Sequence, residues 1–120
     1  MSDTQTNAIV VFVTAPNREE AVRLAEMIVG ARLAACVQIL PEMESIYRWD
    51  GTIQREGEHL IMAKTTLDNF DLIESEVRSL HSYSVPEIIA IPALAISIPY
   101  FEWLNQNVRH PKRKAKAVKK

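Results

Sequence analysis

The pattern of apolar and polar residues predicts four strands and three helices. The run Ala8–Ala15 is apolar and rich in β-branched residues without alternation, which is typical of a strand buried on both faces. After Pro16, apolar residues recur at helical spacing. We expect this helix to bury Ala21, Leu24, Ala25, Ile28 and Val29. Asn17 and Glu20 form a variant of the capping box, so Glu20 is expected to reach back to the Asn17 backbone.

The longest predicted feature is residues 34–66, two strand-like runs joined at Asp50-Gly51. A type I′ turn needs positive φ at both central residues, which Asp and Gly tolerate, so this segment is predicted to be a β-hairpin. Arms over residues 35–49 and 52–66 would each extend roughly 45–50 Å at ~3.3 Å per residue. A compact chain of this length is only about 35 Å across. The hairpin should therefore project from its domain.

A projecting two-stranded ribbon is marginally stable in water on its own. This ribbon carries Ile46 and three further large apolar residues, so we expect another subunit to cover it. The predicted contacts of that interface are Tyr47, Trp49 and Ile53. The alternative is a strongly coiled hairpin that folds back on its own sheet.

The second half of the chain contains the end of the second hairpin arm and predicts one more strand and two helices. Residues 59–66 have no proline and few charges, which favours an inner strand. Asp68 is placed to cap a second helix, and Pro99 suits the first turn of a third. The expected apolar faces are Phe70, Ile73, Val77 and Leu80 in the second helix, and Tyr100, Trp103 and Leu104 in the third. Between these helices, residues 88–96 predict the last strand.

The order β-α-β-β-α-β with a terminal helix predicts an α+β, ferredoxin-like sandwich over residues 8–108. Pro41 and Pro92 each lack a backbone N–H, so their strands are expected at the edges of a four-stranded antiparallel sheet. Right-handed crossovers then place the first and third strands in the middle. Two helices would cover one face, which leaves the other face to solvent or to partners.

Charge is divided unevenly along the chain. Residues 1–108 hold 7 Lys/Arg and all 15 Asp/Glu, whereas residues 109–120 hold 7 Lys/Arg and no acid. The basic tail has too few apolar side chains to fold alone, so residues 109–120, like residues 1–7, are expected to be disordered. Contact of the tail with an anionic surface is the alternative.

Cysteine use and the N-terminus bear on the compartment. Cys36 is the single cysteine, so no intrachain disulfide forms and a reducing environment is expected. The apolar run near the N-terminus is too short for a signal-peptide core or a membrane span. We therefore expect a cytoplasmic protein.

Five short motifs, in order, resemble the divalent-cation tolerance family CutA over about residues 8–108. They are residues 34–37 (AACV), 45–51 (SIYRWDG), 64–66 (KTT), 81–88 (HSYSVPEI) and 100–104 (YFEWL). The resemblance implies a ferredoxin-like homotrimer with PII-like architecture and a role in tolerance of copper and other divalent metals, without an established catalytic reaction.

Two residues are candidate metal ligands. An imidazole can bind copper or zinc, and His81 follows the second helix. Some family members have a histidine pair here and a cysteine at the end of the first strand, where this chain has Leu80, His81 and Val13. Cys36 is the only thiolate for a soft metal. The alternatives are a His81 hydrogen-bonded to a carbonyl or carboxylate, and a Cys36 that only packs.

Lys64 places a charged ammonium group in an inner strand, and this group needs an anionic partner if it is buried. We expect Glu87 to be that partner, reaching from a neighbouring subunit. With Tyr83 and Trp49 or Trp103, these residues would line an inter-subunit cleft for a small anionic metabolite or a metal chelate. A purely structural ion pair at the trimer interface is the alternative.

Two functions known for βαββαβ folds are not supported. The inner strand lacks the aromatic platform of an RNA-recognition motif, and the body is acidic, so no specific nucleic-acid binding is expected. The turn after the first strand, residues 14–18, lacks the glycine of an acylphosphatase loop. No catalytic triad is evident, so the chain is not predicted to be an enzyme.

Overall fold

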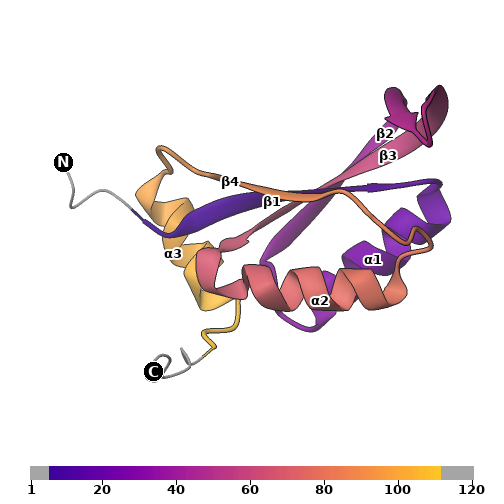
Figure 1. The fold of residues 1–120 in the computed structure, drawn as a ribbon. Helices are drawn as coiled ribbons and strands as arrows, with labels where there is room; N and C mark the ends of the chain where they lie inside the picture. Colours follow the sequence, from indigo (N-terminus) through magenta and orange to yellow (C-terminus); the bar gives the residue numbers. More distant parts are fainter. Residues whose placement is uncertain (1–5, 112–120) are drawn as a thin grey trace, which may run out of the picture.

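The elements of a computed structural model follow the predicted order (Figure 1). The structure describes residues 6–111. Its elements are strand β1 (Ala8–Ala15), helix α1 (Arg18–Gly30), strands β2 (Cys36–Trp49) and β3 (Thr52–Thr66), the 3₁₀ turn η2 (Leu67–Asn69), helix α2 (Phe70–Leu80), strand β4 (Ile88–Pro92) and helix α3 (Ile98–Gln106).

The four strands form one antiparallel sheet in the order β2-β3-β1-β4. The prediction from the prolines is confirmed, because β2 and β4 are the edges and β3 lies inside. The last strand was predicted over residues 88–96, but β4 ends at Pro92. Pro92 pairs with Ile9 near the end of β1, and the chain then leaves after one more bond, from Ala93 N–H to the Ala8 carbonyl.

Helices α1 and α2 lie side by side under one face of the sheet (Figure 1). Alternate residues of the strands point into this layer and form the core. Its strand and helix members include Ile9, Val11, Val13, Ile61, Ala63, Ala21, Leu24, Ile28, Ile73 and Val77. Two residues expected here are instead exposed, Val29 by 42% and Leu80 by 53%. Both lie in the last turn of their helices. Val29 is to one side of the buried stripe of α1, whereas Leu80 shares the face of Ile73 and Val77 but is the last residue of α2.

Both predicted helix caps need correction in part. Asn17 Oδ1 accepts from Glu20 N–H at 2.8 Å, as expected. The Glu20 carboxylate accepts instead from Ser82 N–H at 2.8 Å, so it serves a loop far along the chain. Asp68 does not cap α2: it lies in η2, where it accepts a 2.6 Å hydrogen bond from the Thr66 hydroxyl.

The hairpin of β2 and β3 turns at Asp50 and Gly51, with φ of 51° and 80°. Positive φ at both residues matches the predicted turn. The hairpin tip rises away from the helical layer (Figure 1), and the described residues extend 45 × 38 × 29 Å. The projecting hairpin is therefore observed.

A β-bulge between Leu40 and Met43 shifts the register of β2 by one residue. Leu40 pairs with Leu60, whereas Met43 pairs with Glu58. Before the bulge, even-numbered residues of β2 face away from the helices; beyond it, odd-numbered residues do. Pro41 lies in this interruption, where its missing N–H costs no ladder bond.

The sheet face opposite the helices, here called the open face, is largely apolar. It carries Val10, Phe12, Leu40, Leu60, Met62, Ile89 and Ile91, together with Cys36, Gln38 and Lys64. Ile89 is 50% exposed and Ile91 is 43% exposed. Such a continuous apolar surface is typical of an interaction site.

The predicted disordered ends lie partly within the described residues. Thr6 Oγ1 accepts from Ala8 N–H, and the Asn7 carbonyl accepts from Leu67 N–H. Arg109 N–H donates to the Arg32 carbonyl. Residues 1–5 and 112–120, including nearly all of the basic tail, lie outside the described residues. No helix within residues 6–111 is long and apolar enough to cross a membrane.

Candidate functional site

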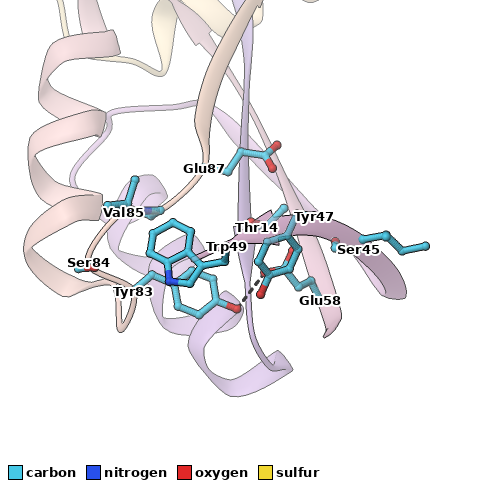
Figure 2. A pocket seen from close by; sticks show the side chains of 11 residues that line it. Thr14, Ser45, Tyr47, Trp49, Glu58, Tyr83, Ser84, Val85 and Glu87 are labelled. Carbon is cyan, nitrogen blue, oxygen red and sulfur yellow. Dashed lines mark hydrogen bonds between the residues drawn. The ribbon is translucent and has the colours of Figure 1, made fainter. Parts of the chain in front are cut away.

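A cavity of about 660 Å³ lies on the open face, where the hairpin leaves the sheet. Figure 2 shows its side chains, which come from β1, both hairpin arms and the loop before β4. The lining residues are Thr14, Ser45, Ile46, Tyr47, Trp49, Glu58, Tyr83, Ser84, Val85, Pro86 and Glu87. We refer to it as the hairpin cavity.

Strand register explains why these residues meet. Thr14 pairs with Leu60, so Glu58, two residues before Leu60 in β3, lies diagonally beside Thr14 on the open face. Glu87 directly precedes Ile88, the partner of Val13, and so reaches the same end of β1. The bulge brings Tyr47 and the other odd-numbered residues of β2 to this face. If β2 had no bulge, the even-numbered residues beyond position 43, and not the odd-numbered ones, would face this side of the sheet.

The loop between α2 and β4 is held by a buried imidazole. The side chain of His81 is fully buried, and its Nε2–H donates to the Thr14 carbonyl at 2.7 Å. Its Nδ1 accepts from Tyr83 N–H at 3.0 Å, and Glu20 Oε2 lies 3.3 Å from the same nitrogen. The rings of His81 and Tyr83 are 4.9 Å apart. These contacts fix the direction in which Tyr83 enters the cavity.

The electrostatics of the cavity are dominated by carboxylates. The Tyr83 hydroxyl donates to Glu58 Oε2 at 2.9 Å (Figure 2). Burial, followed by this bond to Glu58, raises the pKa of Tyr83. Burial and the nearby Glu58 charge also raise the pKa of Glu87. For Tyr47, partial burial with Glu56 and Glu58 raises the pKa in the same way. The cavity therefore disfavours additional negative charge.

Three of the five predicted cleft residues come together here, namely Trp49, Tyr83 and Glu87. Lys64 does not line the cavity; it pairs with Cys36 and Val10 further along the open face, and its ammonium contacts Gln38 Oε1. Within one chain Lys64 is thus apart from Glu87, and a pair between subunits stays a prediction.

Trp103 lies elsewhere, on α3, with its ring 5.5 Å from that of Tyr100. Burial, followed by the nearby Cys36 thiol, raises the pKa of Tyr100. Helix α3 therefore approaches the sheet near Cys36, at the start of β2, whereas the hairpin cavity involves the far end of that strand. Within one chain Trp49 lines the hairpin cavity and Trp103 does not, and the inter-subunit cleft stays a prediction.

The two candidate metal ligands do not form one site within a chain. His81 has protein groups at both ring nitrogens, so a metal would have to displace one of them. Cys36 is partly exposed and pairs with Lys64 of β3, which pairs in turn with Val10 of β1. Val10 is four residues from Thr14 along β1, roughly 13 Å. Among residues 6–111, no cluster of three or more His, Cys, Asp or Glu side chains could hold a metal ion.

Sequence reasoning missed two buried, hydrogen-bonded carboxylates, Glu58 and Glu20. Glu58 is only 6% exposed, which is unusual for a carboxylate. The sequence did contain a signal for Glu58. Glu58 and Lys64 are six positions apart in one strand, so they share a face, and the face predicted to hold Lys64 therefore also holds Glu58. Glu20 gave no such signal, because its capping-box position explained it locally.

Comparisons with known proteins agree on one family. A family model described as CutA1 divalent ion tolerance protein matches residues 9–107. Protein CutA 1, chloroplastic, from Oryza sativa subsp. japonica is 42% identical over 108 residues, covering 90% of this chain and 61% of the rice protein. Divalent-cation tolerance protein CutA from Thermus thermophilus is 43% identical over 98 residues, covering 82% of this chain and 95% of that protein.

Solved structures agree in fold. The crystal structure of CutA1 from Oryza sativa matches with a TM-score of 0.86 at 42% identity, covering 90% of this chain and 99% of the rice chain. The Thermus thermophilus protein matches with a TM-score of 0.83 at 41% identity, covering 85% and 99%. The chain spans 61% and 57% of the length of the rice and Arabidopsis thaliana relatives. With the family model spanning nearly all described residues, this chain belongs to the CutA1 divalent ion tolerance family.

Proposed function

We propose that this protein acts in divalent-cation tolerance as a non-enzymatic homotrimer of PII-like architecture, and that it binds copper or another divalent metal weakly. The observation that carries the proposal is the family match over residues 9–107. A cytoplasmic location is part of the proposal, although the rice and Arabidopsis relatives are named chloroplastic.

The trimer is supported by two apolar surfaces. One is the open face, with its exposed Ile89 and Ile91. The other is the hairpin, where Tyr47, Trp49 and Ile53 are 39%, 50% and 64% exposed. Burying such side chains would stabilise an assembly by about 25 cal/mol per Å² of apolar area, before association costs.

Metal binding is proposed at Cys36 or His81, as separate sites. Cys36 is the better placed, because it is partly exposed and supplies a soft sulfur ligand. A second copy of the chain would have to supply further ligands, since one chain brings no cluster together within residues 6–111.

The test is a titration of the metal-free protein with copper, as Cu(II) and under reducing conditions, with bound metal counted per chain. Cys36→Ala and His81→Ala are compared with His110→Ala, which removes an exposed imidazole bonded to the Asn105 carbonyl. We expect saturable binding that is lost in one of the first two variants and kept in the third. Negligible binding by the unmodified protein would overturn the metal proposal.

A second function is favoured by the hairpin cavity. Its volume, about 660 Å³, is within the range of small-molecule sites. We propose as the alternative a PII-like sensor or scaffold that binds a small anionic metabolite or a protein partner in an inter-subunit cleft, of which the hairpin cavity would form one wall, and whose hairpins or basic tail contact a partner. The sensor function predicts ligand-dependent stabilisation without metal.

A further inference from the structure

We propose that the open face packs head to tail against a second copy of the chain, so that Lys64 of one copy reaches Glu58 of the next and closes the hairpin cavity. This inference rests on the trimer proposed above and deepens it by naming two residues that meet between copies. It also gives Lys64 a different partner from Glu87, the carboxylate expected from the sequence.

Charge is divided along the open face. Among the described strand residues on this face, Lys64 is the only basic one, and it lies beside Val10 and Cys36. Glu58 lies on the same strand and the same face, at the end near the hairpin. Lys64 and Glu58 are six residues apart, roughly 20 Å at ~3.3 Å per residue. Their side chains therefore cannot meet within one chain.

Both charges lack a partner of opposite sign. The Glu58 carboxylate accepts a hydrogen bond from the Tyr83 hydroxyl (Figure 2), and the Lys64 ammonium contacts the neutral Oε1 of Gln38. Within residues 6–111 neither side chain belongs to an ion pair. A contact between copies would supply each charge with the partner that its own chain does not bring to it.

Glu58 is the carboxylate that needs such a partner most. It is 6% exposed in one chain, and association can only lower the exposure of a side chain, so Glu58 stays buried in any assembly. A buried carboxylate is costly without a cationic partner. Glu87 is exposed in one chain and does not carry this cost by itself. The burial of Glu58 therefore selects it over Glu87.

The symmetry of a ring agrees with this pairing. Three identical copies close into a ring through a heterologous interface, in which a patch of one copy meets a different patch of the next. The two ends of the open face are such patches, because they differ in charge. Like ends placed together would set lysine against lysine, which is repulsive. Head-to-tail packing avoids this repulsion and buries the apolar residues between the ends, including Ile89 and Ile91.

The test is a double-mutant cycle on assembly. Two residues roughly 20 Å apart in one chain should have additive effects, so coupling between them reports a contact between copies. We expect Lys64→Gln and Glu58→Gln each to weaken association about tenfold or more. The double variant should associate at least about tenfold more tightly than the product of the two single losses predicts. Sedimentation over a dilution series, with urea added if the unmodified protein does not dissociate, gives the association constants.

Two further variants make the cycle specific. Arg78→Gln is the matched control, because it removes an exposed cation of α2 that pairs with Glu74 in the helical layer; it should leave association unchanged. Charge exchange covers the case in which Glu58→Gln does not fold, as circular dichroism would show. Lys64→Glu alone should lose the assembly, and Lys64→Glu combined with Glu58→Lys should regain it.

The possible failures are distinguishable. Additive losses for Lys64→Gln and Glu58→Gln would overturn the contact, while an unmodified protein with the mass of three chains would leave the trimer in place. An unmodified protein that sediments as one chain at every concentration would remove the trimer and this inference together. Coupling of Lys64 to Glu87→Gln in place of Glu58→Gln would overturn the assignment of Glu58.

Discussion

The Tyr83 hydroxyl donates a hydrogen bond of 2.9 Å to the Glu58 carboxylate, and so joins the loop after α2 to the inner strand β3. The two residues are 25 positions apart in sequence. Tyr83 is in turn oriented by His81 through its own backbone N–H. The cavity wall is therefore coupled to the buried polar network under the sheet.

Replacing Tyr83 by Phe removes the donor and leaves the Glu58 carboxylate buried without its hydrogen bond. We expect a loss of about 1–3 kcal/mol in the free energy of unfolding, measured by urea denaturation. In a Glu58→Gln background, Tyr83→Phe should lower the free energy of unfolding by less, since the hydrogen bond that it removes is then between neutral groups. Equal costs in both backgrounds would show that the two residues are not coupled.

His81→Ala should destabilise the fold by about 2–4 kcal/mol, because it leaves the Thr14 carbonyl and Tyr83 N–H without their partner and opens a cavity. His110→Ala, at an exposed position, should change the free energy of unfolding by about 0.5 kcal/mol or less. Denaturation at equal protein concentration checks both. A His81→Ala protein as stable as the control would contradict the structural role of the imidazole.

The raised pKa of Glu87 predicts a pH-dependent cost. An acid whose pKa is higher in the folded than in the unfolded state binds more protons when folded, so stability falls as pH rises from the unfolded value of 4.5. Glu87→Gln should remove this loss. The variant should melt at a higher temperature than the original protein near about pH 7, and the difference should shrink towards about pH 4. Thermal scans across this range test it; a difference that grows in acid would be the wrong sign.

Asp50→Pro should disrupt the hairpin turn, because Asp50 has a φ of 51° and proline is restricted to about −65°. If the hairpin supports a trimer, the native mass should fall below that of three chains. Asp50→Asn is the matched control, since Asn tolerates the same backbone. Light scattering reports the mass. A Pro variant with unchanged mass would contradict hairpin-dependent assembly.

Features with a strong local cause could be predicted from the sequence. Asp50-Gly51 located the turn, and Pro41 and Pro92 located the sheet edges. The length of β4 and the exposure of Leu80 could not be predicted, because they depend on where neighbouring elements stop.

The candidate site was predicted only in part, for a related reason. Trp49, Tyr83 and Glu87, which were expected in an inter-subunit cleft, line the hairpin cavity of a single chain. The position of Glu58 beside them follows from the register of β3 against β1, which the sequence alone did not indicate. Lys64, chosen for its burial cost, lies further along the same face because strand pairing, not charge, sets its position.

The bulge between Leu40 and Met43 also limits how this hairpin can change length. A single residue added or lost beyond it would turn Tyr47 and Trp49 to the opposite side of the ribbon. At the bulge itself, loss of one residue would restore a regular ladder without that reversal. Insertions and deletions near the hairpin tip should thus involve an even number of residues in β2. A change by one residue should be tolerated only beside Pro41, at the bulge.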